Sequence, residues 1–318
     1  VIWNLLPKYQ QDEDIDIEGP GYASAIDRIR IAFTTDSATQ KEKLRAALRD
    51  TSFVRVIDTG VSGVRRAKPK DIYIATDRLQ QLFSGVRGVL IVDSNCDCLR
   101  GEDIRDLLVS CGSSRYLVPE PVASGLGHSG KEQIRREAGL ERASWEHTPE
   151  DYTLRGLSLL LEFLPTLNFD DAARRAKVLW DALADLEARG TGAFYGTYRW
   201  GYFHESRNAR FDAFFVRELN LATWVPARDG ELVAPGLVLF DDLCWKANPF
   251  LQSKILFKPP IIDQLAREAG IDPAAIDLLR KLGITNVAEL TSRLGIVDSS
   301  SESALATSPK SGDGTSSG

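Results

Sequence analysis

The chain has 318 residues, 43% of them hydrophobic, and a net charge of −6 at neutral pH. This length allows one large domain or two of ordinary size, and the acidic balance argues against a polyanion as the main ligand, although a local basic patch is compatible with it. The most apolar stretch, 157–167, is interrupted by Glu162 and Pro165 and is too short to span a bilayer, so we expect no membrane association.

The four cysteines, Cys96, Cys98, Cys111 and Cys244, are irregularly spaced in a chain too large to need disulfide bonds. We therefore expect reduced thiols and a cytoplasmic location. The sequence begins with Val1 and contains no methionine, whereas a whole gene product normally starts with one. From this we expect a fragment of a larger protein.

The first part of the chain predicts alternating helices and strands. Residues 10–20 are acidic without apolar periodicity, which is typical of a loop, and Ser37 is placed to cap a helix. Apolar spacing predicts helices over 25–33, 38–49, 77–83 and 102–111, and strands over 53–58, 71–75 and 88–93. Gly85 and Gly112 stand where helices end in a left-handed residue.

The middle of the chain predicts a long loop and then helices. Pro119, Pro121 and the glycines between 125 and 130 mark the loop, which enters a helix over 131–138. One helix face is predicted by the stripe Ala172, Ala176, Leu179, Leu183 and Leu186, with Gly190 as its stop.

The last third predicts a strand, a helix, a hairpin and three short helices. Tyr198, Trp200 and Tyr202 alternate as in a strand, and 211–221 has helical spacing. The Asp229-Gly230 pair is a hairpin signal after Trp224. Short helices are expected over 259–270, 273–282 and 286–294, and the Ser- and Gly-rich tail 297–318 is expected to be a disordered linker.

The two halves of the chain resemble each other. Phe53-Val54 precedes Gly63 and Pro69, and Trp224-Val225 precedes Gly230 and Pro235 in the same order. Each half then ends in a helix stopped by Gly112 or Gly283. These patterns predict an α+β fold with two related helix–β-hairpin–helix units joined by a helical middle segment, over 1–125, 126–192 and 193–296, with the tail 297–318. Repeated units favour a binding architecture over a single catalytic pocket.

Two segments come close to known catalytic patterns. The run 125–131 (GLGHSGK) fits a phosphate-cradling loop until Glu132, which stands where a Mg²⁺-binding hydroxyl is required. Asp93 ends a predicted strand, where a phosphoryl-accepting nucleophile can lie, but Asn95 replaces the second carboxylate that would assist it. We expect a flexible loop at 125–131 and a polar strand-end turn at Asp93, with an enzyme using either group as an alternative.

Other patterns fail at further positions. The segment from Asp93 lacks the glycine and the terminal glutamate of a calcium loop. Cys96 and Cys98 have no second pair of cysteines or histidines at a metal-binding spacing, so we predict no metal site. Since the other patterns also fail, we predict no catalytic or cofactor-binding residue in this chain.

Two groups of residues are candidates for an interaction surface. An aromatic group could form a stacking or peptide-binding surface, although aromatic residues at strand spacing are more often part of a core. Its members are Phe194, Tyr195, Tyr198, Trp200, Tyr202 and Phe203, with Trp224 as a further candidate. The run 279–290 (LRKLGITNVAEL) resembles a helix-hairpin-helix element, with Lys281 and Arg293 available to a nucleic-acid phosphate.

The run 214–242 (FFVRELNLATWVPARDGELVAPGLVLFDD), with 248–251 (NPFL) and 257–260 (FKPP), carries a family resemblance. It resembles large bacterial proteins with a sacsin-type N-terminal ATPase domain of the GHKL class, which gyrase, histidine kinases and a heat-shock chaperone share. The resemblance extends over most of 1–296 and is concentrated in 214–296. It implies a region downstream of the ATPase, because the ATP-binding box of that class is missing from this sequence.

These observations give a leading functional hypothesis. We expect a non-catalytic region that couples ATP state to a client protein, or to other domains of the same protein. The resemblance implies that ATP and Mg²⁺ would bind outside this sequence, in the ATPase. The alternatives are a nucleic-acid-associated or defence module that contacts DNA through 279–293, and a stand-alone enzyme that uses Asp93 or the 125–131 loop.

Overall fold

The computed structural model of the chain describes residues 19–35 and 37–260, and its strand pairs are antiparallel within an α+β fold, as predicted. The helices expected from Pro259 onwards, the tail and most of the acidic loop lie outside the described residues. The chain divides into two compact units, Val1–Lys258 and Pro259–Gly318, and the fold given below is that of the first. In the described part, no helix has the length and apolar character to cross a membrane.

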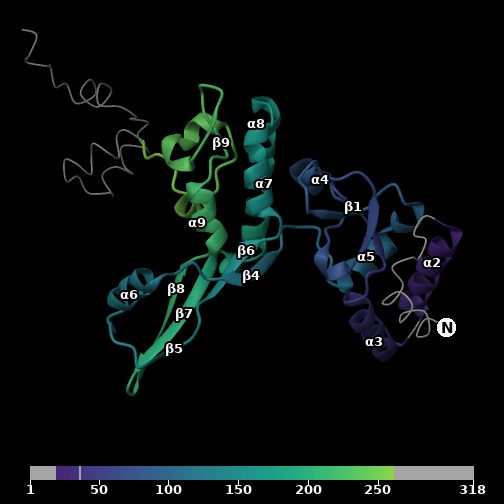
Figure 1. The fold of residues 1–318 in the computed structure, drawn as a ribbon, viewed down its shortest axis with the longest axis horizontal. Helices are drawn as coiled ribbons and strands as arrows, with labels where there is room; N and C mark the ends of the chain where they lie inside the picture. Colours follow the sequence, from purple (N-terminus) through teal and green to yellow (C-terminus); the bar gives the residue numbers. More distant parts are fainter. Residues whose placement is uncertain (1–18, 36, 261–318) are drawn as a thin grey trace, which may run out of the picture. The chain divides into compact units, whose positions relative to one another are not determined.

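The first region combines a three-stranded sheet of order β2-β1-β3 with four helices. Its elements are α2 (Pro20–Thr35), α3 (Ala38–Arg49), β1 (Val54–Asp58), β2 (Val64–Ala67), α4 (Asp77–Phe83), β3 (Leu90–Val92) and α5 (Glu102–Ser110) (Figure 1). Each of these except β2 has a predicted counterpart. The expected cap is present at α3, where the Ser37 backbone N–H donates to Gln40 Oε1 at 3.2 Å.

The strand predicted over 71–75 is wrong as a regular strand. The 3₁₀ helix η1 (Pro69–Asp71) takes its first residue, because Pro69 fixes a backbone angle suited to a helical turn. Only Tyr73 then forms parallel bridges, to Ile91 and Ser114. The Tyr73 hydroxyl donates to the carbonyl of Arg155 at 3.0 Å and so ties this segment to the following sheet.

The sheet of the first region lies between two hydrophobic cores. Residues of α2, α3, β1 and α5 share one core. Residues of α4 contribute to the other, which we call the main core. Ile91 and Val92, which are neighbours on β3, belong to different cores, as side-chain alternation along a strand requires.

The second sheet has the order β4-β6-β7-β5, and β8 pairs with β7. Its strands are β4 (Pro119–Ala123), β5 (Trp145–Glu146), β6 (Glu150–Leu154), β7 (Tyr195–Tyr202) and β8 (Glu205–Asp212). The loop predicted around Pro119 and Pro121 is wrong, because both prolines lie in β4. This strand is at the sheet edge, where a residue without an N–H is tolerated.

Two further expectations need correction in this sheet. The predicted helical middle segment contains β5 and β6. The helix expected over 211–221 begins only at Phe214, because Phe211 belongs to β8. A Cβ at Gly196 would lie 2.4 Å from the Phe211 ring, so this ring occupies the space that the missing side chain leaves.

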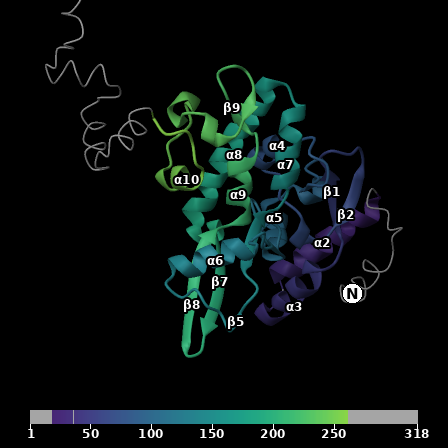
Figure 2. The same ribbon diagram turned by 60° about the vertical axis from the view of Figure 1, so that its left-hand side comes forward.

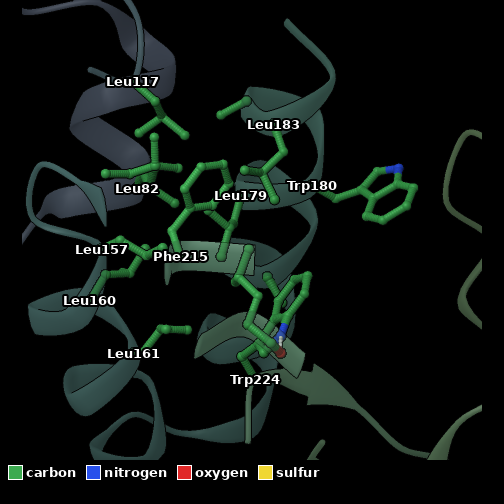
Figure 3. Packing of buried hydrophobic residues seen from close by; sticks show 14 of the residues in the cluster. Leu82, Leu117, Leu157, Leu160, Leu161, Leu179, Trp180, Leu183, Phe215 and Trp224 are labelled. Atoms are coloured by element: carbon green, nitrogen blue, oxygen red, sulfur yellow. Dashed lines mark hydrogen bonds between the residues drawn. The ribbon is translucent and has the colours of Figure 1, made fainter. Parts of the chain in front are cut away.

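Three helices come between strands of the second sheet in the chain order. Helix α6 (His128–Glu137) connects β4 and β5, and α7 (Leu157–Phe163) and α8 (Phe169–Arg189) lie between β6 and β7 in sequence. The predicted stripe of α8 is buried throughout, and Gly190 is its C-cap. In the main core, α8 residues meet Leu82 of α4, Leu157 of α7, Phe215 and Trp224 (Figure 3). This core joins side chains from all three segments predicted as separate domains, 1–125, 126–192 and 193–296.

The last described elements are α9 (Phe214–Leu221), β9 (Val225–Pro226), β10 (Leu232–Val233) and α10 (Pro249–Lys254). The expected hairpin is confirmed, with Gly230 at φ +88° in its turn. The remaining short 3₁₀ helices are η2 (Asp97–Leu99), η3 (Leu164–Thr166), η4 (Thr191–Phe194), η5 (Pro235–Leu237) and η6 (Phe240–Leu243).

The two hairpin segments share an order of elements. In each, a helix leads to a hairpin, then to a 3₁₀ helix that starts with proline (Pro69 or Pro235), then to a residue in an isolated parallel bridge (Tyr73 or Leu239). The helix that would match α5 in the second segment, 276–283, lies outside the described residues. The two-copy arrangement therefore stays a prediction.

Candidate functional site

Four of the residues predicted for an interaction surface lie in the interior, including Phe194, which is 1% exposed. Tyr198, Trp200 and Trp224 are each 0% exposed, so an exposed stacking surface is wrong for them and the core alternative holds. The Trp224 indole donates to the carbonyl of Leu219 at 2.9 Å and stacks on Trp245. The Trp-Val-Pro element thus anchors its hairpin in the main core. Lys281 and Arg293 lie outside the described residues.

A polar cluster holds α6 on the sheet, and we call Lys131, Arg135, Glu146 and Tyr198 the α6 polar cluster. Lys131 Nζ lies 2.7 Å from Glu146 Oε1, and the Tyr198 hydroxyl donates to Glu146 Oε2. Arg135 Nη1 lies 3.3 Å from the Tyr198 hydroxyl and 3.4 Å from the Glu146 carboxylate. The cluster therefore joins side chains from α6, β5 and β7.

The charges in this cluster shift two pKa values. The hydrogen bond from Lys131 lowers the pKa of Glu146, and the bond from Tyr198 lowers it further. Burial raises the pKa of Tyr198 to about 12, and its hydrogen bond to the Glu146 carboxylate adds to the effect. The carboxylate stays ionised and the phenol stays neutral at ordinary pH, which is the state in which the cluster is hydrogen-bonded.

The segment 125–131 is the entry into α6 and not an extended phosphate loop. Gly127 is the N-cap, and the helix begins at His128, three residues before its predicted start. Lys131, which a phosphate loop would direct at its ligand, forms its ion pair with Glu146. The strand before the segment is the edge strand β4 and not a central strand.

Asp93 is also engaged within the fold. Its side chain is 1% exposed, and Oδ2 accepts from Arg55 Nε at 2.7 Å. Oδ1 accepts from the backbone N–H of Asn95 at 2.9 Å. This is the geometry of a polar strand-end turn, and it leaves the Asp93 carboxylate with little access for a substrate. Within the described residues, no group of three or more His, Cys, Asp or Glu side chains is placed to hold a metal ion.

We call the β7–β8 hairpin the arm. Exposed aromatic residues gather at the end of the arm that contains its turn. The arm runs past α6, away from α7 and α8 (Figures 1 and 2). Tyr202 pairs with Glu205 across a two-residue turn of Phe203 and His204. Phe203 is 76% exposed and has φ +52°, a left-handed conformation that is unusual for an aromatic residue. The Phe203 and Tyr202 rings meet edge to face at 4.4 Å.

Trp145 of β5 adds a second aromatic surface to the arm. It is 43% exposed and pairs with Gly201, and a Cβ at Gly201 would lie 2.4 Å from its ring. The indole therefore lies over the glycine. The next residue, Glu146, pairs with Trp200 and reaches the α6 polar cluster, so Trp145 is on the opposite face of the sheet from α6. We call Trp145, Tyr202 and Phe203 the arm tip.

Strand β8 forms one long side of the arm. Within the described residues it pairs with β7 alone, through all eight of its residues. Its other edge therefore presents backbone N–H and C=O groups that an extended chain can pair with. Residues 205–208 are exposed, and Arg207 and Arg210 place charge along this strand.

Tyr202 and Phe203 belong to the aromatic group predicted from the sequence, whereas Trp145 and β8 were not predicted as site elements. The turn at Phe203-His204 lacks the glycine or asparagine that marks a two-residue hairpin, so the return strand was not recognised. A usable signal was the alternation of Ala209 and Phe211 with Arg210 and Asp212, which is typical of a strand.

The comparisons with known proteins identify no relative. No protein-family model matches the chain, and no similar protein was found among the curated proteins or the solved structures.

Proposed function

We propose that this chain is a partner-binding region and that the arm tip, together with the free edge of β8, is its contact surface. The exposure and the backbone conformation of Phe203 carry the proposal. A large apolar ring is 76% exposed there, in a backbone conformation that favours glycine. The role agrees with the client-binding or coupling region that a sacsin-type resemblance implies.

The fold gains little stability from Phe203. A non-glycine residue in a left-handed conformation costs on the order of 1 kcal/mol, and exposed apolar area adds an unfavourable hydration term. Binding a partner would bury the ring and recover that hydration term. Aromatic side chains also dominate the energetics of protein interfaces, because they combine large area with few rotatable bonds.

The partner that fits this surface is an extended, partly apolar polypeptide segment. Its backbone would pair with the free edge of β8, and its apolar side chains would contact Phe203, in the turn that begins this strand. An unfolded client protein presents such segments. We place this role in the cytoplasm, where free cysteines such as the four of this chain persist. ATP and Mg²⁺ would act in the ATPase that the resemblance implies.

The test uses the full chain and a permanently unfolded probe, fluorescein-labelled carboxymethylated α-lactalbumin, with fluorescence anisotropy as the readout. We expect saturable binding that Phe203→Ser weakens about tenfold, the size of an interface hot spot. The matched control is Leu221→Ser, because Leu221 is 81% exposed and lies outside the arm. We expect that control to change affinity less than twofold.

Several outcomes would count against the proposal. Absence of binding by the unaltered chain contradicts a client-binding role, and equal losses in the two variants place the contact elsewhere. Binding of DNA that is salt-dependent and lost in Lys281→Glu would favour the nucleic-acid alternative. Hydrolysis of ATP by the chain itself, lost in Asp93→Ala or Lys131→Ala, would favour the enzyme alternative.

A further inference from the structure

Two of the four cysteines lie against each other in the turn after β3. Cys96 precedes η2 and Cys98 is inside it, and their Sγ atoms are 3.2 Å apart. Both side chains are partly exposed. Cys111 is buried and Cys244 is exposed, and neither has another thiol recorded beside it. The chain therefore holds one contacting pair and two single thiols.

We propose that Cys96 and Cys98 form a redox-active pair that closes to an intramolecular disulfide by exchange with a small disulfide such as oxidised glutathione. The Cys96 thiolate attacks one sulfur of glutathione disulfide, which releases one glutathione thiol and leaves a mixed disulfide. The Cys98 thiol then loses its proton and attacks Cys96 Sγ, which releases the second glutathione. Two protein thiols are oxidised and one glutathione disulfide is reduced to two thiols.

The geometry makes this closure a local change. A disulfide needs sulfur atoms about 2.05 Å apart, so the 3.2 Å contact must shorten by roughly 1.2 Å. Both cysteines belong to one short turn, and rotation of their side chains requires no movement between distant elements. Asp97, between them, points to solvent and pairs with Arg100 at 2.8 Å, so it does not obstruct the contact.

Burial and the contact between the two sulfur atoms both affect the reactivity of Cys98. Burial raises the pKa of Cys98 to about 12, and the hydrogen bond to Cys96 and the nearby Asp27 carboxylate add to this shift. The thiolate is the nucleophile in this exchange, so a raised pKa reduces the reactive fraction of Cys98. The 3.2 Å contact holds Cys98 Sγ beside Cys96 Sγ, the sulfur that it attacks in the second step.

The pair also lies where its oxidation state affects packing. Leu99, the last residue of η2, is 1% exposed and shares a core with Ile26 and Ile29 of α2. A disulfide within the turn would restrict η2 beneath that helix. Disulfides in cytoplasmic proteins are commonly transient and regulatory, so a reversible bond is compatible with the location proposed above.

The test exposes the full chain to oxidised glutathione, quenches with acid, alkylates in denaturant with N-ethylmaleimide and digests with trypsin. Both cysteines fall in one tryptic peptide, 88–100 (GVLIVDSNCDCLR). We expect this peptide unalkylated and lighter by two hydrogen atoms, with recovery of two alkylated thiols after dithiothreitol. Cys244 should carry glutathione, and buried Cys111 should remain alkylated. Cys98→Ser should trap glutathione on Cys96.

The proposal is overturned if peptide 88–100 remains doubly alkylated while Cys244 has reacted. It is also overturned if glutathione stays attached to that peptide in the unaltered chain, because Cys98 then fails to resolve the mixed disulfide. A cross-link from either cysteine to Cys244 would likewise exclude the local pair. In Cys98→Ser, absence of glutathione on Cys96 would contradict the assigned order of attack.

Discussion

The interior of strand β7 and its C-terminal end use their aromatic residues in opposite ways. Tyr198 and Trp200 are buried, and the Trp200 indole donates to the carbonyl of Leu140, just after α6, at 2.9 Å. Tyr202 and Phe203 continue the same strand into the arm tip. There, Phe203 is mostly exposed, and the Arg142 guanidinium lies over the Tyr202 ring at 5.9 Å.

The difference shows that a helix packed on the strand decides whether its aromatic residues belong to a core or to an exposed surface. The α6 polar cluster holds a helix over the interior of the strand, and the packing of Tyr198 on Trp200 at 4.9 Å makes this part a core. Beyond Leu140 the chain turns back into β5, and no helix of the described residues covers the arm tip. The buried residues Tyr198 and Trp200 should therefore determine stability, and the arm tip should determine partner binding.

The largest effect that would test this comparison is at Trp200. Replacing a fully buried indole by alanine removes its packing and its hydrogen bond to Leu140, and we expect Trp200→Ala to lower the free energy of unfolding by about 3–5 kcal/mol. Urea unfolding followed by circular dichroism measures the change. The matched variant Phe203→Ala should change it by less than about 0.5 kcal/mol. Similar losses in the two variants would show that the arm tip is also packed.

The prediction of the fold from sequence succeeded where local patterns suffice. The α8 stripe, the Ser37 cap and the Gly230 turn each depend on residues close in sequence, and the structure has all three. The strand at Pro119 was missed because proline indicates a loop unless the strand is known to be at an edge. Edge position is a property of the whole sheet order, which no local pattern specifies.

The candidate site was harder to predict for a related reason. Tyr198, Trp200 and Tyr202 have the same spacing, and only the distant residues of α6 separate the buried pair from the exposed tip. Trp145 gains its place because Gly201 has no side chain, and that pairing joins residues far apart in the chain. Phe203 lies in a turn that has no glycine to mark it.

A smaller effect concerns how the stability contributed by the buried Tyr198 side chain depends on pH. The pKa of Tyr198 is raised from 10.0 to about 12 in the fold, so the unfolded chain ionises first as the pH rises. The stability that the neutral phenol contributes is complete below about pH 10 and is lost toward pH 12, on the order of 2 kcal/mol. Tyr198→Phe should lack this loss, although it is less stable at pH 7 by about 1 kcal/mol. Unfolding curves between pH 8 and 12 compare the two.

That expectation fails if both proteins lose stability in parallel above pH 10. The remaining tyrosines are the same in the two chains, so their titration cancels in the difference. A parallel loss would mean that the Tyr198 hydroxyl titrates like an exposed phenol. The Tyr198 hydroxyl would then not be buried and hydrogen-bonded in the α6 polar cluster.

The smallest effect, at the arm tip, has the opposite sign. Phe203 holds φ +52°, which glycine adopts without a Cβ clash, so Phe203→Gly should raise the free energy of unfolding by about 0.5 kcal/mol. The same change should weaken binding of the unfolded probe about tenfold, because it removes the exposed ring. His204→Gly is the matched control: His204 is the other turn residue and has no positive φ, so glycine there should destabilise slightly and leave binding unchanged. A residue whose removal stabilises the fold but reduces binding is retained for the partner, whereas loss of stability in Phe203→Gly would mean that Phe203 contributes to the fold of the arm itself.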